Sequence, residues 1–191
     1  RNLEYDGDYV DIHNVTQEII QRVNQVGKVR EADIVIVEIG GTTGEYQNVL
    51  FLEANRLLKL KHPDDVIHVH ITYLPIPASL GEMKSKPAQM SVRDLHAVGI
   101  QPDILLARAE TAIDEPRAKR LSFNTGIEEG DIIPAPDVTN IYRVPLNFEK
   151  FHITDKILKK LKLKRRQKDL EKWREFVTKA ENPTQEVKIA I

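Results

Sequence analysis

The chain has 191 residues, 41% of them hydrophobic and 30% charged, with a formal net charge of −1. This composition is typical of a globular protein with enough residues for a hydrophobic core. Its near-neutral charge creates no overall electrostatic field that would attract nucleic acid or a membrane surface. No apolar run reaches the ~18 residues of a membrane span. Because cysteine is absent, disulfides, thiolate metal sites and a cysteine nucleophile are excluded. We expect a cytoplasmic protein without nucleic-acid or membrane partners.

Apolar residues recur with helical or strand periodicity along most of the chain, and proline and glycine mark several ends. One helix, for example, begins at Pro87 and ends before Gly99, the usual positions of these residues. In chain order the pattern predicts a helix at 14–26, a strand at 32–41, a helix at 48–60, a strand at 65–75, a helix at 87–99, a strand at 102–109 and a helix at 115–126.

The predicted strands alternate with helices and are apolar along their whole length. This pattern indicates an α/β fold, a doubly wound, mostly parallel sheet with helices on both faces. Ligands of such sheets bind beyond the carboxyl ends of the strands. We therefore expect functional residues at three places, namely 38–41, the loop 74–86, and 108–110.

The last part of the chain differs from the rest. Residues 150–183 predict a helical tail, basic at first and then mixed, which is either an anion-binding arm or a solvated helical face. The overall charge balance and the single tryptophan, Trp173, favour the solvated face. The chain begins with Arg1 rather than methionine, and its final EVKIAI predicts a strand without a partner, so we expect part of a longer polypeptide.

The stretch GEMKSKPAQMS, residues 81–91, places two lysines at the start of a predicted helix. Lys84 and Lys86 are two residues apart, so in extended chain their side chains lie on the same side. Free amides and the positive end of the helix dipole also lie there, which makes two lysines unfavourable in the empty protein. A bound polyanion such as a triphosphate would remove this conflict. The alternative is an exposed loop with ordinary lysines.

The stretch VEIGGTTGEYQN, residues 37–48, is a second candidate site. Its glycines allow the backbone to approach a ligand, and the Glu38 carboxylate suits a hard cation such as Mg²⁺. No Gly-Lys-Ser/Thr follows, so the stretch is not a P-loop. A tight turn between a strand and a helix explains the same residues equally well.

Three further residues have two interpretations each. His68 and His70 lie on one face of a strand, where packing explains them better than a metal site because no third ligand is evident. Lys119 lies within a predicted helix, and spacing does not decide between a surface lysine and another phosphate contact.

Taken together, these stretches resemble the synthase (amidoligase) domain of the CTP synthase family. The segments that carry the resemblance are VEIGGTTGEYQNVLFLEANR at 37–56, IHVHITYLPIPASLGEMKSKPAQMSVRDLHAVGIQPDILLAR at 67–108, PDVTNIYRVPL at 136–146 and LEKWREFVTKAENPTQEVKIAI at 170–191. They are long and collinear with the family's motifs, and together they extend over essentially the whole chain.

The resemblance implies a function and a domain organisation. The family is a ligase that converts UTP to CTP with ATP, Mg²⁺ and ammonia, which its glutaminase domain releases from glutamine, and it forms a homotetramer. Residues 1–165 would be the C-terminal part of a P-loop-NTPase-like synthase domain, incomplete here, 166–184 its linker helix, and 185–191 the opening strand of a truncated glutaminase domain.

The resemblance also implies roles for individual residues. Glu38 matches a Mg²⁺ ligand, and Asp137 and Val138 match the adenine side of the ATP site. The residues that match the UTP and CTP site are Glu45, Tyr46, Gln47, Lys84, Ser85, Lys86, Pro87, Ala88, Gln89 and Lys119.

The sequence also departs from the family pattern. Ser85 and Ala88 replace two threonines of KTKPTQ, and residues 45–47 replace Asp-Ile-Glu. The family's P-loop would lie before residue 1 and its glutaminase cysteine after residue 191, so we expect the isolated chain to be inactive. Two alternatives stay open. A related ligase such as dethiobiotin synthetase would not need the 84–89 segment, and a non-catalytic nucleotide-binding or filament-forming homologue would tolerate the replacements at 45–47 and 88.

Overall fold

The protein is described here as a computed structural model, which covers residues 11–165, 169–185 and 188. Its centre is a parallel sheet in the order β1 (Val69–Tyr73), β2 (Ile104–Ala109) and β3 (Ile132–Pro136). The helices are α1 (Ile12–Arg30), α2 (Val49–Lys61), α3 (Lys86–Ala97), α4 (Glu115–Thr125), α5 (Val144–Lys150), α6 (Ile153–Lys160) and α7 (Glu171–Glu181), with short 3-10 turns η1 (Tyr46–Asn48), η2 (Glu129–Asp131) and η3 (Ile141–Arg143).

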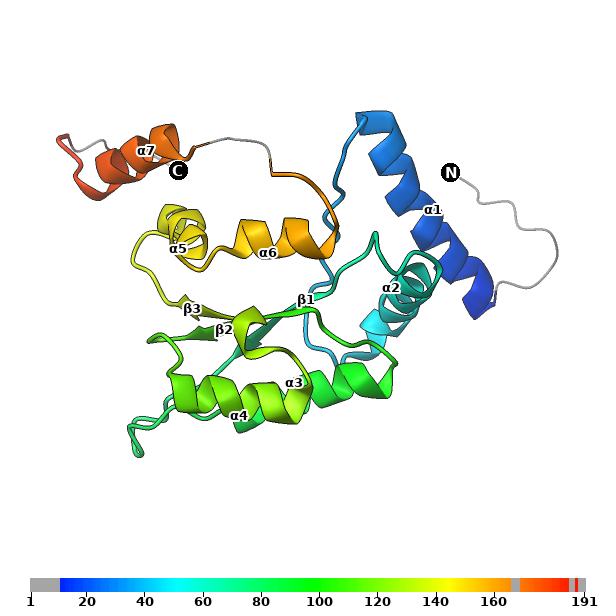
Figure 1. The fold of residues 1–191 in the computed structure, drawn as a ribbon, viewed down its shortest axis with the longest axis horizontal. Coiled ribbons are helices and arrows are strands. Elements are labelled where there is room, and N and C mark those ends of the chain that lie inside the picture. Colours follow the sequence, from blue (N-terminus) through cyan, green and yellow to red (C-terminus); the bar gives the residue numbers. More distant parts are fainter. Residues whose placement is uncertain (1–10, 166–168, 186–187, 189–191) are drawn as a thin grey trace.

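Helices cover both faces of the sheet, as Figure 1 shows, with α3 and α4 on one side and α5 and α6 on the other. Side chains alternate along β2, so Leu105 packs toward α3 and α4 whereas Leu106 packs toward α5 and α6. The core under α3 and α4 includes Leu121 and Val92, which are almost completely buried. The predicted α/β class, with a parallel sheet between two helical layers, is confirmed.

The segment 32–41 is not a strand, so that part of the prediction was wrong. It has no regular secondary structure, and Ile36 and Val37 are 89% and 52% exposed. An apolar run reports a preference for burial, whereas a strand also needs a backbone partner, and 32–41 has no ladder partner among the described residues. The predicted strand end at Glu38 is therefore an irregular connection between α1 and α2.

The strand β3 was not predicted from the sequence. It contains Pro134 and Pro136, which lack the N–H that a central strand needs. β3 pairs with β2 alone among the described elements, and proline is tolerated on such an edge strand. The proline-rich composition therefore concealed a strand that lies at the edge of the sheet.

The tail forms separate helices rather than one. His152, in the left-handed region at φ 54°, separates α5 from α6. Trp173 of α7 donates its Nε1–H to the carbonyl of Tyr142 over 2.9 Å, and its ring lies against those of Tyr142 and Phe176. The tryptophan is thus part of a packed aromatic cluster. The predicted strand at 185–191 lies almost entirely outside the described residues.

The two histidines of the 65–75 segment are packing residues in this structure. The His70 ring lies 2.7 Å from the Ser91 hydroxyl, and neither ring nitrogen of the buried His68 has a hydrogen-bond partner among the described residues. Burial lowers the pKa of His68, the Lys59 charge lowers it further, and Asp103 and the nearby Gln101 backbone partly oppose the shift. Burial also lowers the pKa of His70.

We expect these lowered pKa values to make the protein less stable in acid. The unfolded chain binds these protons more readily than the folded chain, so the stabilisation is complete above pH ~6.5 and is lost below it. The loss approaches about 1.4 kcal/mol per pH unit for each histidine that stays neutral in the fold. Urea unfolding at pH 7.5 and 5.5 should show a smaller loss in His68→Leu than in the unchanged protein. The exposed His96→Gln is the control, and an unchanged pH slope in His68→Leu would contradict the assignment.

Candidate functional site

The carboxyl ends of the three strands meet at one edge of the sheet. The Leu74 amide donates to the Arg108 carbonyl over 2.8 Å, and the Asp137 amide donates to the Ala109 carbonyl over 2.8 Å. These bonds continue the ladders beyond the strands, and Arg108 Nε lies 3.2 Å from Asp137 Oδ1. Two of the three predicted positions, the loop 74–86 and residues 108–110, therefore start from this edge.

The loop between β1 and α3 is closed at its base. The Lys84 amide donates to the Pro75 carbonyl over 2.9 Å, so the chain returns to the point where it left the sheet. Next to it, Met83 is buried in the same core cluster as Leu74. The tip of the loop is exposed, whereas its last residues are fixed beside the strand ends.

Helix α3 begins at Lys86, with Ser85 as its N-cap residue and a proline in its first turn. The Ser85 hydroxyl does not cap a backbone amide and instead accepts from Gln89 Nε2 over 3.2 Å. The amides of Lys86 and Ala88 lie in the first turn, where an α-helix offers no internal acceptor. No acidic residue lies in that turn. The N-terminus of α3 therefore has donors and positive charge but no carboxylate of its own.

The two lysines of this segment differ in their surroundings. Lys84 Nζ lies 2.8 Å from Glu82 Oε2, and its hydrogen bond and charge, together with those of Arg117, hold the pKa of Glu82 below its usual range. Lys86 is exposed and has no ion-pair partner among the described residues. Of the two cations, Lys86 is the one that is free for an external anion.

The other residues of the 84–89 segment have distinct positions. Pro87 is exposed, whereas the Ala88 side chain is fully buried in the core. Only the backbone of residue 88, and not its methyl group, is therefore available to a ligand.

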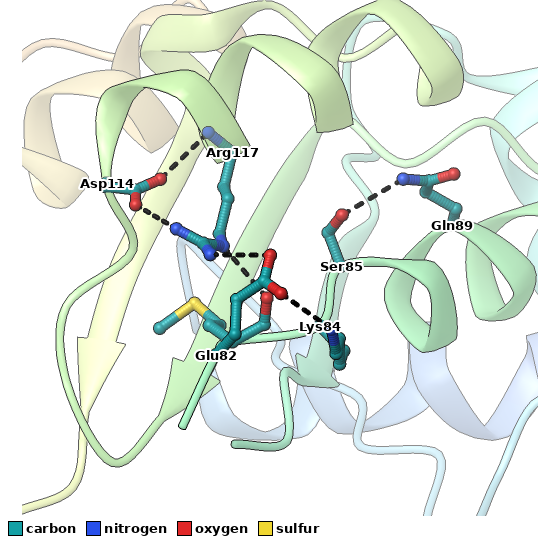
Figure 2. Close-up of polar contacts among 7 residues, drawn as sticks. Glu82, Lys84, Ser85, Gln89, Asp114 and Arg117 are labelled. Atoms are coloured by element: carbon teal, nitrogen blue, oxygen red, sulfur yellow. Dashed lines mark hydrogen bonds and ion pairs between the residues drawn. The ribbon is translucent and has the colours of Figure 1, made fainter. Parts of the chain in front are cut away.

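Arg117 and Glu82 were missed in the sequence and belong to this region, as Figure 2 shows. Arg117, on α4, donates Nε to the Met83 carbonyl over 2.9 Å, contacts Glu82 over 3.3 Å, and forms an ion pair with Asp114. Glu82 thus lies between Arg117 and Lys84. Residues 82 and 117 are 35 positions apart, so sequence spacing gives no signal of this contact.

The second candidate stretch forms a turn with its own hydrogen bonds. Glu45 accepts from the Thr42 amide over 2.8 Å and from Gln47 Nε2 over 2.7 Å, and Asn48 donates to the Gly40 carbonyl over 2.7 Å. Gly41 has a φ of +78°, and a Cβ there would lie 2.3 Å from the Glu45 carboxylate. Gly41 was predicted to let the backbone approach a ligand, but in the structure it accommodates this turn.

The remaining predicted residues are not gathered into one site by the described contacts. Tyr46 is 93% exposed, and Lys119 pairs with Glu115, whose hydrogen bond raises the pKa of Lys119. Asp137 pairs with Arg108, and Val138 follows it beyond β3.

Glu38 is the predicted metal ligand, and it is exposed on the connection between α1 and α2. No group of three or more His, Asp or Glu side chains within the described residues could hold a metal ion. Glu38 thus supplies one carboxylate, and the described residues do not complete a Mg²⁺ site around it. The described part of the chain also contains no helix of a length and hydropathy suited to crossing a membrane.

The fold and the residues at the carboxyl ends of its strands define the class of protein. It is a parallel α/β domain with a positively charged helix N-terminus beside its strand ends. A family model described as the CTP synthase N-terminus matches residues 1–163, and the chain belongs to that family. It is 42% identical to the CTP synthase of Thermococcus gammatolerans over 193 residues, which is all of this chain and 36% of the relative. It is 40% identical to that of Prochlorococcus marinus over all of this chain and 35% of the relative.

The name CTP synthase identifies these relatives as enzymes that make CTP. A third, from Caldanaerobacter subterraneus, is 36% identical over 98% of this chain. The chain spans about 36% of the length of the relatives it matches.

Proposed function

We propose that this chain supplies the UTP- and CTP-binding part of a CTP synthase active site. The full-length protein would use ATP and glutamine-derived ammonia to convert UTP to CTP. The observation that carries the proposal is the N-terminus of α3, which lies beside the strand ends. Its first turn has free amides and no acidic residue, and Lys86 has no ion-pair partner among the described residues. A triphosphate suits this combination of donors and positive charge.

The structure suggests a division of tasks among the binding residues. Lys86 would neutralise phosphate charge, the α3 amides would donate to phosphate oxygens, and Lys84 would join them on leaving Glu82. Ser85 and Gln89, already hydrogen-bonded to each other, would hold the start of the helix in place. The bound ATP would supply the phosphoryl group that activates the pyrimidine.

The remaining assignments belong to the same proposal and rest on the family match. Glu38 would be one Mg²⁺ ligand, and Asp137 and Val138 would contact the adenine of ATP. The 45–47 turn and Lys119 would belong to the UTP and CTP site, in a cytoplasmic homotetramer. Residues 1–165 would form part of the synthase domain, 166–184 its linker helix, and 185–191 the start of a glutaminase domain.

A non-catalytic nucleotide-binding or filament-forming homologue is the second candidate. One observation favours it: the Glu45 carboxylate already accepts hydrogen bonds from Thr42 and Gln47 within the turn. Incubation of the full-length protein with UTP, ATP, Mg²⁺ and glutamine separates the two candidates. We expect CTP to form, and UTP binding without CTP formation would favour the non-catalytic homologue.

The Lys86→Ala variant tests the proposed role of the α3 N-terminus. Loss of a charge-assisted phosphate contact of about 1.5–3 kcal/mol should weaken UTP binding by roughly 10- to 150-fold. The half-saturating ATP concentration should be almost unchanged. The control is Lys61→Ala, which removes an exposed lysine near the end of α2. Equal losses for UTP and ATP would mean that Lys86 supports the fold or the ATP site instead.

A further inference from the structure

Arg117 connects helix α4 to the loop that leads into α3. Its Nε donates to the Met83 carbonyl over 2.9 Å, and its guanidinium also contacts Glu82 over 3.3 Å. A third contact, to Asp114, holds the guanidinium on its own helix. The Arg117 side chain is only 24% exposed, so it lies in the interface between α4 and the loop rather than in solvent.

The contacts of Arg117 lie immediately before the predicted phosphate-binding residues. Met83 and Glu82 precede Lys84, and Glu82 in turn holds Lys84 Nζ over 2.8 Å. Figure 2 shows this chain of contacts from Asp114 through Arg117 and Glu82 to Lys84. A shift of the Met83 carbonyl would move Lys84 and the first turn of α3 with it.

An arginine is suited to this position for a geometric reason. The planar guanidinium has five N–H donors in a fixed fork, so it can bind a carbonyl and two carboxylates from different directions. A lysine in the same place has a single charged nitrogen on a flexible stem and would not hold all three partners in fixed geometry.

We propose that Arg117 is a positioning residue for the phosphate-binding segment 84–89, acting through Glu82 and the Met83 carbonyl. This inference rests on the proposed function for its ligand, whereas the positioning itself is a property of the ligand-free protein. Arg117 has no role in the chemistry. It fixes where the backbone of residues 84–86 and the α3 amides lie before the nucleotide arrives, which reduces the ordering that binding would otherwise require, whereas the Lys84 side chain leaves Glu82 on binding.

The Arg117 side chain can be removed without removing the cap of α4. Asp114 caps this helix by accepting from the backbone amide of Arg117 over 3.0 Å, and that amide remains in any variant other than proline. An Arg117→Ala protein therefore keeps its helix start. Arg120→Ala is the matched control, because Arg120 is an exposed arginine on the same helix.

The test combines amide hydrogen exchange with nucleotide titrations of the full-length protein. In Arg117→Ala without ligand, the non-proline amides of 77–86 should exchange about tenfold faster, because the contacts of the guanidinium with the Met83 carbonyl and with Glu82 are lost. The half-saturating UTP concentration should rise about tenfold while that of ATP stays constant. For both measurements, Arg117→Lys should give values between those of Arg117→Ala and the unchanged protein. Arg120→Ala should give the values of the unchanged protein.

The outcomes separate this inference from the proposed function. Unchanged exchange at 77–86 in Arg117→Ala would overturn the positioning role, as would an equal increase in Arg120→Ala. Equal losses for UTP and ATP would also overturn it, because they indicate general loosening. Faster exchange in Arg117→Ala alone, in a protein that does not bind UTP, would support the positioning role and reject the UTP site.

Discussion

Reversing the charge at position 86, with Lys86→Glu, should weaken UTP binding by about 100-fold or more. The variant loses a charge-assisted contact and adds repulsion between a carboxylate and the triphosphate. The same change should stabilise the ligand-free protein by about 0.5–1 kcal/mol, because a negative side chain is favourable at the N-terminus of a helix. Binding and stability should therefore change in opposite directions.

Thermal unfolding and UTP titration on the same preparations check this prediction. Lys86→Gln is the matched control, since it removes the positive charge without adding a negative one and should give an intermediate result for both measurements. A Lys86→Glu protein that binds UTP normally would remove Lys86 from the phosphate site. One that loses stability together with binding would indicate that the lysine supports the fold.

Replacing Leu121 with alanine should lower the free energy of unfolding by about 2–5 kcal/mol. Leu121 is fully buried on the α4 side of the sheet, and its removal would leave a cavity between α4 and β2. Leu60→Ala is the control, because Leu60 is 65% exposed on α2 and should change stability by less than about 0.5 kcal/mol. Urea unfolding measures both changes, and equal effects would contradict the assigned core.

The sheet shows what apolar patterns can and cannot predict. The pattern at 102–109 predicted β2 closely because it is the central strand of the sheet, where continuous apolar character and pairing on both edges coincide. The same pattern at 32–41 predicted a strand that is absent, since no backbone partner lies beside it among the described residues. β3 was missed because its prolines are tolerated only through its edge position.

In the candidate site, too, features set by neighbouring residues could be predicted from the sequence, whereas contacts between distant residues could not. The position of Lys86 at the start of a helix follows from Pro87 and the apolar spacing after it, which are local features. The contact of Arg117 with the Met83 carbonyl depends on how α4 packs beside α3, and no rule of sequence spacing predicts this packing. Likewise, the bond between Glu45 and Gln47 is a detail of one turn, which residue types alone did not reveal.

A structure of the full-length protein with UTP bound tests the central claim most directly. We predict triphosphate oxygens at about 2.7–3.0 Å from the Lys86 Nζ and from first-turn amides of α3, with Lys84 turned from Glu82 toward the phosphates. A UTP molecule ordered elsewhere, with Lys84 still paired with Glu82 and the α3 N-terminus free, would contradict the account.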